Sequence, residues 1–444
     1  MEVLVYTQRY THRTGYIFRF IFEEILGVNV RFTSSYTEVK AHMGVLISYF
    51  KTRVKDGIHV VPHNLLIEDS ITPQQINLFE WNKLTAFFKT SDEADIPFDL
   101  FAASFYLVSR YEEYLNFNPD KHGRYPSSIS LAAKAGFLDQ PLIDQWAYQL
   151  VAVIQKKYPA FEIHKRKFST ITTIDVDNAY AFSHKGILRS VLGSFLSLAK
   201  LNFFELYYRI KVYFKISKDP YDVYDQLFDL LKQNEKVIWF IPVADPGPYD
   251  RNLSVRNKGV RKLIKEIGRK YRVGIHPSYR SGINVERLRL EISSLVNILD
   301  KEISCSRQHF IRILLPYTYR NLVVSGITED YSMGYTDKVG FRASTCTPFK
   351  FFDLLQNRVI NLLVYPFQTM DFTYLEVLKY TPEKTVQDVV TLAKRVKEVD
   401  GTFISIWHNE YFSDYTNWKG WNIVLPSVIE ELNKLEGENK VHSQ

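Results

Sequence analysis

Carboxylate and imidazole side chains stand at the ends of three apolar runs in the last two thirds of the chain. Asp175 and Asp177 lie in TTIDVDNAY, His276 lies in VGIHPSY and His408 lies in ISIWHNEYF. Because side chains in an extended segment alternate with period two, the two carboxylates project on the same side. One carboxylate of such a pair can bind a divalent cation while the other accepts a proton from water. The same Asp-rich segment could instead begin a turn or cap a helix.

Apolar, strand-like segments alternate with helical ones from residue 168 onward. The predicted strands cover 168–175, 237–244, 271–276, 310–315, 327–330, 339–344, 360–366 and 403–408, with one predicted helix over 285–299. This alternation is typical of a parallel β-barrel or sheet with helices outside. Since the carboxyl ends of barrel strands meet at one rim, we expect Asp175, His276 and His408 to converge there.

The pattern of the first 165 residues is different. Short apolar runs alternate with polar joints, and a segment with helical periodicity follows over 98–115. We therefore predict a smaller α/β domain over 1–165, of unknown role, followed by a distorted (β/α) barrel over 166–440.

The composition is that of a basic globular protein. The 444 residues carry a formal net charge of +7 and are 46% hydrophobic. Basic residues are spread along the chain, and no helix-turn-helix, finger or basic–aromatic motif is found, so no nucleic-acid partner is expected. The two cysteines, Cys305 and Cys346, are too few for a disulfide scaffold. Neither a secretory signal nor a spanning segment is recognised, and a cytoplasmic location is expected.

The stretch 186–218 combines apolar and basic residues. Its apolar residues recur at helical spacing, with Lys200, Arg209, Lys211 and Lys215 between them. Three interpretations stay open: a helical pair packed on the barrel, a peripheral contact with an anionic membrane face, and a site for a lipid-linked substrate.

The order of these motifs resembles the polysaccharide deacetylases, the NodB-homology group of carbohydrate esterase family 4. The resembling features are Asp-x-Asp after the first strand, Gly-Ile-His-Pro-Ser after the third, a later Gly-Phe-Arg, and a strand that ends in Trp-His. They lie between residues 168 and 435. The chain looks most similar to a divergent branch from bacterial surface-polysaccharide gene sets. There an N-terminal domain with a Ser-Arg-Tyr-Glu-Glu-Tyr segment, here 109–114, precedes the deacetylase-like part.

The resemblance implies a metal-dependent hydrolase. Its substrate would be an amino sugar of a surface polysaccharide, or of a lipid-linked precursor, from which an N-acetyl or related acyl group is removed. Carried over residue by residue, the resemblance implies Asp175 as general base, Asp177 and His276 as metal ligands, and His408 as general acid. Asp371 would orient His408. The implied metal is zinc, with cobalt or nickel as alternatives.

The sequence departs from the family pattern at Arg280. This residue stands four positions after His276, where the family has a second metal-binding histidine. A guanidinium offers no lone pair to a metal. His309 is the replacement candidate, because together with Asp177 and His276 it would give three ligands and leave a position for water. His309 could equally contact substrate or lie behind the ligands. An incomplete metal site would instead indicate a catalytically degenerate protein that binds a glycan or assists surface-polysaccharide assembly.

Four further residues are candidates for the site. Arg307 and Arg342 could pair with Asp175 and keep it ionised and oriented. Tyr279 and Trp407 suit stacking on a sugar ring, and they suit packing in the barrel equally well.

Overall fold

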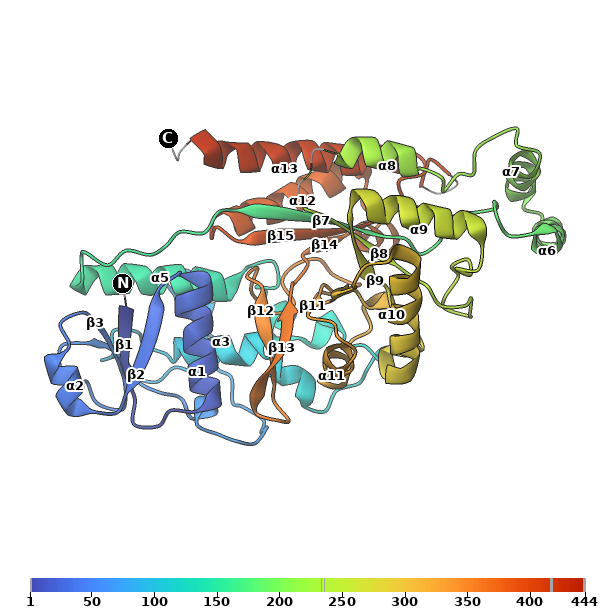
Figure 1. Cartoon of the computed structure of the whole chain (residues 1–444). Helices are drawn as coiled ribbons and strands as arrows, with labels where there is room; N and C mark the ends of the chain where they lie inside the picture. The colour runs from blue at the N-terminus through green and yellow to red at the C-terminus, as the bar shows by residue number, and fades with distance from the viewer. Residues whose placement is uncertain (1, 233, 235, 416–417, 442–444) are drawn as a thin grey trace.

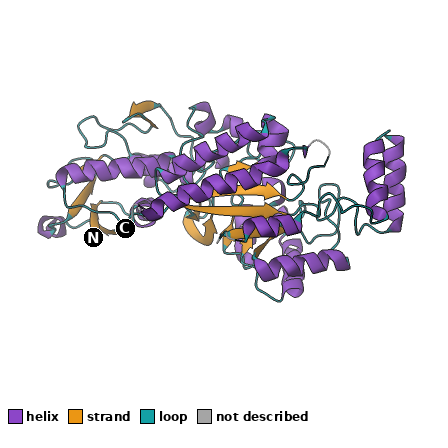
Figure 2. Ribbon diagram, turned by 90° about the horizontal axis from the view of Figure 1, so that it is seen from above, coloured by secondary structure: helices purple, strands orange, loops and turns teal. Residues whose placement is uncertain are grey.

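The computed structural model contains two largely parallel β-sheets with helices around them (Figures 1 and 2). It describes residues 2–232, 234, 236–415 and 418–441, and the side chains of these except 187–189 and 438–441. Met1 of the predicted first domain and residues 233, 235 and 416–417 of the predicted second one lie outside the described residues.

The first sheet is fully parallel, with the strand order β2-β1-β3-β4. Its strands are β1 (Glu2–Tyr6), β2 (Asn29–Thr33), β3 (Val45–Tyr49) and β4 (Ile58–Val60). Around it lie α1 (His12–Arg19), α2 (Tyr36–Ala41), α3 (Leu100–Val108), α4 (Leu131–Lys134), α5 (Leu142–Lys157) and the hairpin β5 (Phe79–Trp81)–β6 (Leu84–Ala86). Strands β3 and β4 are buried throughout, as expected for a parallel sheet covered on both faces.

The second sheet has nine strands in the order β12-β13-β11-β10-β9-β8-β7-β15-β14. They are β7 (Ser169–Asp175), β8 (Val237–Ile241), β9 (Arg272–Ile275), β10 (Cys305–Ser306), β11 (Glu329–Asp330), β12 (Phe349–Asp353), β13 (Arg358–Val364), β14 (Thr369–Met370) and β15 (Thr402–His408). All neighbouring pairs are parallel except β12–β13. The α/β character expected from the sequence is therefore confirmed.

A distorted (β/α) barrel was expected, but the described strands do not close into a barrel. The ladder ends at β12 on one side and at β14 on the other. A short irregular segment lies between β13 and β14: the N–H of Tyr365 donates to the carbonyl of Asp330 (2.8 Å), and the N–H of Gln368 donates to that of Ile404 (3.0 Å). This segment joins β11 to β15 by isolated hydrogen bonds instead of a continuous strand, which is why the ladder stays open.

Helices cover the second sheet. They are α8 (Tyr224–Leu231), α9 (Lys258–Lys270), α10 (Val285–Leu299), α11 (Tyr317–Val324), α12 (Pro382–Lys397) and α13 (Val424–Val441). The starts of α9 and α12 follow ordinary capping rules: the Asn257 side chain accepts from the N–H of Gly259 (2.9 Å), and Thr381 caps α12 with Pro382 in the first turn.

The two sheets share one hydrophobic core. Phe352 of β12 packs its ring 5.1 Å from that of Tyr16 in α1 and 5.0 Å from that of Phe105 in α3. The second sheet is thus held against the helices of the first.

Two helices, α6 (Ile187–Ala199) and α7 (Phe203–Tyr213), stand apart from both sheets. In Figures 1 and 2 they lie beyond the right-hand end of the second sheet. The helical periodicity predicted for this stretch is confirmed. The two helices pack on each other and on nearby loops, and they do not pack along the second sheet. No helix among the described residues is long and apolar enough to cross a membrane.

Candidate metal centre

The site residues lie at the carboxyl ends of parallel strands. Asp175 ends β7 and is in register with His408, which ends β15. His276 directly follows β9, and Asp371 directly follows β14. Because these strands are parallel, their ends face the same edge of the sheet, and the structure brings the four side chains to one place.

Asp177, His276 and His309 form a compact cluster. Nε2 of His276 lies 3.2 Å from Oδ1 of Asp177, and Nε2 of His309 lies 3.4 Å from Oδ2. One ligand atom from each of the three residues can be chosen so that all lie within 4.8 Å of one another. Nitrogen and carboxylate oxygen in this arrangement are the donor set of zinc and similar divalent cations.

The two imidazole rings are fixed from behind. Nδ1 of His276 lies 2.7 Å from the carbonyl oxygen of Arg307, and Nδ1 of His309 lies 3.0 Å from Oδ1 of Asp250. An Nδ1–H that donates to these oxygens leaves Nε2 with its lone pair directed at Asp177. Histidines that bind a metal are commonly oriented by such outer partners. The residues therefore fit a cation, and Oδ1 of Asp177 is buried with no hydrogen-bond partner in the described structure.

The electrostatics of the cluster follow from its charges. Burial opposes ionisation of Asp177, but His309 and His276 outweigh it and hold the pKa of Asp177 well below its usual value. Burial likewise lowers the pKa of His309, whereas Asp177 and Asp250 raise it to about 9. A cation that binds here must displace the histidine protons, so its affinity falls as the pH is lowered.

Asp175 lies beside this cluster and is almost fully buried. Its Oδ1 is 3.7 Å from Nε of Arg307, and neither atom has a hydrogen-bond partner in the described structure. Arg307 is held by Thr173, whose hydroxyl accepts from Nη2 at 2.9 Å, and by the ring of Phe240 at 4.9 Å. The buried guanidinium supplies the charge that a buried carboxylate needs. The predicted pairing of Arg307 with Asp175 is thus seen as an ion pair.

His408 is tied to Asp371. Its Nδ1 lies 2.7 Å from Oδ1 of Asp371, its backbone N–H donates to Oδ2 at 2.6 Å, and its Nε2 lies 4.0 Å from Oδ2 of Asp177. Burial lowers the pKa of His408, but Asp371 outweighs burial and raises it to about 10. The imidazole is thereby held protonated at the edge of the cluster.

Arg342 does not pair with Asp175, contrary to the prediction. Its Nη2 lies 2.7 Å from Oε2 of Glu113, and its Nη1 donates to the carbonyl of Gly334 at 2.9 Å. The reason is Glu113, a buried carboxylate of the N-terminal part that the sequence pattern could not bring to this position. Arg342 therefore belongs to the contact between the two sheets.

The two aromatic candidates differ in their surroundings. Tyr279 stacks on Tyr249 with ring centroids 4.3 Å apart, and the guanidinium of Arg312 lies 4.5 Å from its ring. Trp407 is buried, and its indole N–H donates to Ser405 at 2.8 Å. It lines a small cavity together with Asp371 and His408. Trp407 therefore packs behind the site, and only Tyr279 keeps partial exposure.

Two acidic residues near the cluster were not among the predicted ones. Asp250, in the loop after β8, holds both His309 and the backbone N–H of Tyr279. Glu410 follows β15 and hydrogen-bonds Asn178; burial and the Asp177 charge raise its pKa to about 7. Both residues come after a predicted strand, at the same edge of the sheet. This position is the feature of the sequence that could have identified them.

Comparisons with known proteins bear on the two parts of the chain separately. Residues 3–159 match the model of DUF7033, a family of unknown function. No curated protein matches the chain. Among solved structures, a "putative polysaccharide deacetylase from Mycobacterium smegmatis" shares 15% identity at a TM-score of 0.39, over 61% of this chain and 85% of that one.

Two further solved structures are of a BA3943 mutant described as a CE4 family pseudoenzyme, one of them with restored enzymatic activity. Both share 11% identity, over 61% of this chain and 64% of theirs, at TM-scores of 0.32 and 0.31.

Proposed function

We propose that the chain is a metal-dependent hydrolase that removes an N-acetyl or related acyl group from an amino sugar of a surface polysaccharide or its precursor. The observation that carries the proposal is that Nε2 of His276 and Nε2 of His309 both face Asp177. The motif order in the sequence, which resembles the polysaccharide deacetylases, supports the substrate class. A distorted barrel of the deacetylase type, with an irregular segment in place of one strand, is the fold we propose with it.

The cation would be bound by Asp177, His276 and His309, and the proposed cation is zinc. When bound, the cation supplies a Lewis acid that polarises the acyl carbonyl and lowers the pKa of water. The protein contributes the geometry: the three ligands follow β7, β9 and β10, and each imidazole is oriented from behind.

Asp175 is the proposed general base. It is buried, its Oδ1 has no hydrogen-bond partner in the described structure, and Nε of Arg307 lies 3.7 Å from that oxygen. A carboxylate in this state takes the proton of water as the oxygen attacks the acyl carbon.

His408 is the proposed general acid. The amide C–N bond breaks only if the sugar nitrogen receives a proton, because an amide anion is a very poor leaving group. His408 is held protonated by Asp371 and directs Nε2 toward the cluster. It therefore donates to the departing nitrogen, and Asp371 orients it.

The missing second histidine of the sequence motif does not leave the cluster short of a ligand. Arg280 is exposed, whereas His309 is buried and brings its Nε2 to Asp177. The alternative, a degenerate protein that binds a glycan, depends on an incomplete metal site. The position of His309 beside Asp177 therefore favours the proposed hydrolase.

The test combines metal binding with turnover on N-acetylated oligosaccharides. Asp177→Ala should lose bound zinc, whereas His408→Ala and Asp175→Asn should keep zinc and lose turnover by about 100-fold or more. Metal-free protein, or full turnover in all three variants, would refute the proposal. Zinc binding together with glycan binding but no release of acetate would support the degenerate alternative.

A further inference from the structure

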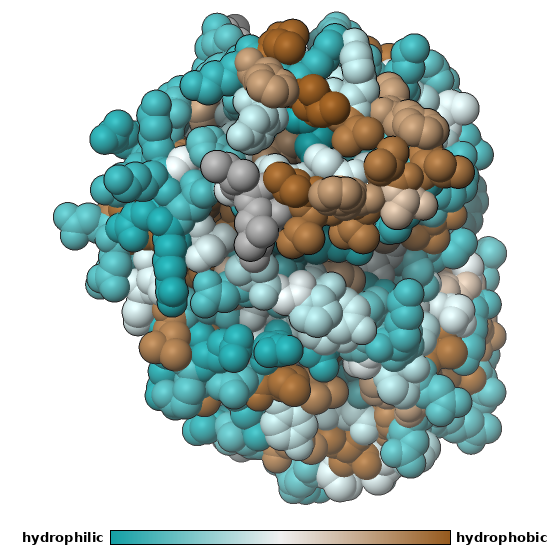
Figure 3. Space-filling model, turned by 90° about the vertical axis from the view of Figure 1, so that its right-hand side faces the viewer, coloured by the Kyte–Doolittle hydropathy of each residue, from teal (hydrophilic) through white to brown (hydrophobic). Residues whose placement is uncertain are grey.

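The α6–α7 hairpin carries a large share of the exposed apolar side chains of the chain. Most of the strongly exposed side chains in and next to α6 and α7 are aliphatic or aromatic. Their exposed fractions are 66% at Phe195 and Phe214, 68% at Ile216 and 73% at Leu201. Figure 3, which faces the end of the molecule where the hairpin lies, shows apolar side chains gathered on one part of that face. A contiguous exposed apolar patch is typical of a surface that contacts a partner or a membrane.

The same segment holds most of the net charge. Residues 186–218 contain six Lys and Arg against a single acidic residue, Glu205, a formal charge of +5 out of +7 for the whole chain. An apolar face flanked by cations is the composition of helices that lie in the interface of an anionic membrane. A symmetric contact with a second copy would bring two such cationic segments together, which electrostatics disfavours.

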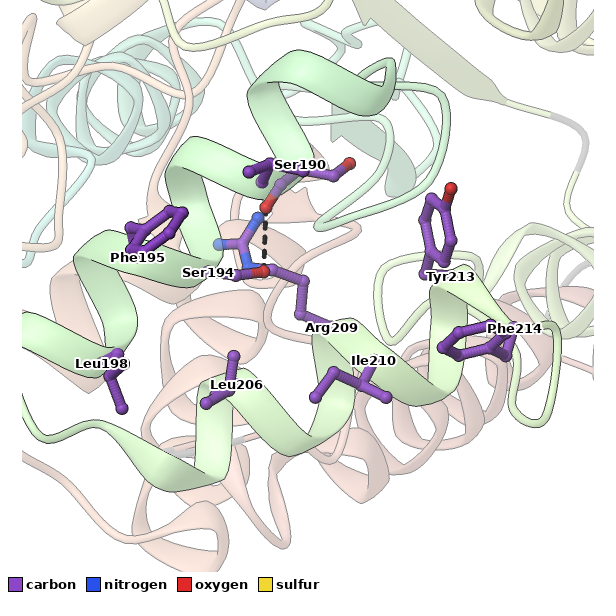
Figure 4. A pocket seen from close by; sticks show the side chains of 10 residues that line it. Ser190, Ser194, Phe195, Leu198, Leu206, Arg209, Ile210, Tyr213 and Phe214 are labelled. Carbon is purple, nitrogen blue, oxygen red and sulfur yellow. Dashed lines mark hydrogen bonds between the residues drawn. The ribbon is translucent and has the colours of Figure 1, made fainter.

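The two helices form a fixed unit. The guanidinium of Arg209 in α7 lies where a Cβ on Gly193 of α6 would stand, so the absence of a side chain there leaves room for that guanidinium between the helices. Arg209 also pairs with Glu205 at 2.6 Å and lies 4.8 Å from the ring of Phe182. Between the helices is an open groove of about 350 Å³ (Figure 4), whose lining includes Phe195, Leu198, Ile210 and Phe214.

The base of the hairpin is tied to the loop that follows β7. The carboxylate of Asp219, just after the hairpin, accepts from the backbone N–H groups of Ala181, Phe182 and Ser183, at 2.6–2.8 Å. The hairpin is inserted between β7, which carries Asp175, and β8. Its position is therefore fixed relative to the strand that supplies both carboxylates.

A row of aromatic rings connects the hairpin to His408. Successive centroid distances of 5.1–6.3 Å link Phe204, Tyr415, Tyr221, Trp418, Tyr411 and His408. Tyr and Trp side chains suit a membrane–water interface, where one end is apolar and the other is wet. The hairpin and the site are thus linked by a continuous row of ring contacts, in which Tyr415 is buried.

We infer that the α6–α7 hairpin binds the surface of an anionic membrane, with its apolar face inserted at the level of the headgroups and its lysines among the lipid phosphates. The candidate site then faces a substrate at the membrane surface. The membrane contact is independent of the proposed hydrolysis and is tested without it.

The experiment is flotation of the full chain with vesicles of phosphatidylcholine alone or mixed with phosphatidylglycerol. The chain should bind the anionic vesicles and release as salt is raised. Lys200→Gln with Lys215→Gln should weaken binding roughly 25-fold, at about fivefold for each basic residue near an anionic surface. Phe195→Ser with Phe214→Ser should weaken it about tenfold or more.

Matched controls replace exposed residues of the same kind in other parts of the chain. These are Met43→Ser with Leu290→Ser for the apolar pair, and Lys83→Gln with Lys134→Gln for the charged pair. All variants should keep the unfolding midpoint and the zinc affinity of the unaltered chain. Absence of vesicle binding, or an equal loss in the controls, would overturn the inference. So would a concentration-dependent dimer that Phe195→Ser with Phe214→Ser abolishes, because the face would then be a contact between copies.

Discussion

Nδ1 of His309 lies 3.0 Å from Oδ1 of Asp250, while Nε2 of the same ring lies 3.4 Å from Oδ2 of Asp177. The imidazole therefore stands between two carboxylates, one in position to share a cation and one behind it. A carboxylate behind a metal-binding histidine fixes the tautomer and raises the basicity of the ligand nitrogen.

Asp250→Asn should weaken zinc binding about 10- to 100-fold, the usual effect of losing an outer partner of a histidine ligand. The amide keeps the shape of the side chain but loses the charge. Titration calorimetry with zinc measures the affinity, and Asp245→Asn, an exposed change in the same loop, is the control. Equal affinities of the Asp250 variant and the unaltered chain would show that the aspartate does not support a metal ligand.

His309→Ala should remove high-affinity zinc, and adding Arg280→His should not restore it. His309 is buried against Asp177, whereas Arg280 is exposed at the start of the turn Ser281–Ile283. Bound metal per chain after dialysis is the measurement, with Arg280→His alone as the control, which should keep full zinc content. Recovery of zinc in the double variant would mean that the histidine at the family position reaches the cluster.

Much of the second sheet could be predicted because its main strands are apolar runs. The predicted strands 168–175, 271–276 and 403–408 correspond to β7, β9 and β15, and the predicted helix 285–299 is α10. Periodicity identifies such segments, and the parallel arrangement then places their carboxyl ends at one edge.

The strand prediction failed in two apolar segments that do not form extended strands. The strand expected at 310–315 is absent; a two-residue strand, β10, precedes it, and Phe310 and Ile311 have φ of 60° and 53°, which extended chain does not adopt. The segment 339–344 is likewise irregular in the structure. Arg342 pairs with Glu113, 229 positions away, and no local pattern in the sequence carries such a contact.

Glu113→Gln should destabilise the fold by about 3–5 kcal/mol, the usual cost of breaking a buried charge cluster. Glu113 accepts from Nε of Arg110 at 2.8 Å and from Nε and Nη2 of Arg342 at 3.0 and 2.7 Å. All three side chains are buried, so the variant leaves two guanidinium groups without their shared carboxylate.

Urea unfolding of the full chain measures this loss. The control is Glu286→Gln, which removes an exposed ion pair with Arg289 and should change the free energy of unfolding by no more than about 0.5 kcal/mol. Similar effects of the two changes would mean that the buried cluster contributes little to holding the two sheets together.

The same carboxylate predicts a specific acid sensitivity. Burial raises the pKa of Glu113, but Arg342 and Arg110 outweigh burial and hold the pKa below its ordinary value of 4.5. Because the folded-state pKa is the lower one, the unfolded chain binds the proton first. The stability from this group is therefore complete above pH 4.5 and is lost as the pH falls toward the folded-state pKa. In that window the unaltered chain should lose up to about 1.4 kcal/mol per pH unit more than Glu113→Gln does. Urea unfolding at a series of pH values compares the two curves directly. Other acids titrate in both proteins and cancel in the difference, so parallel curves would show that folding does not lower the pKa of Glu113.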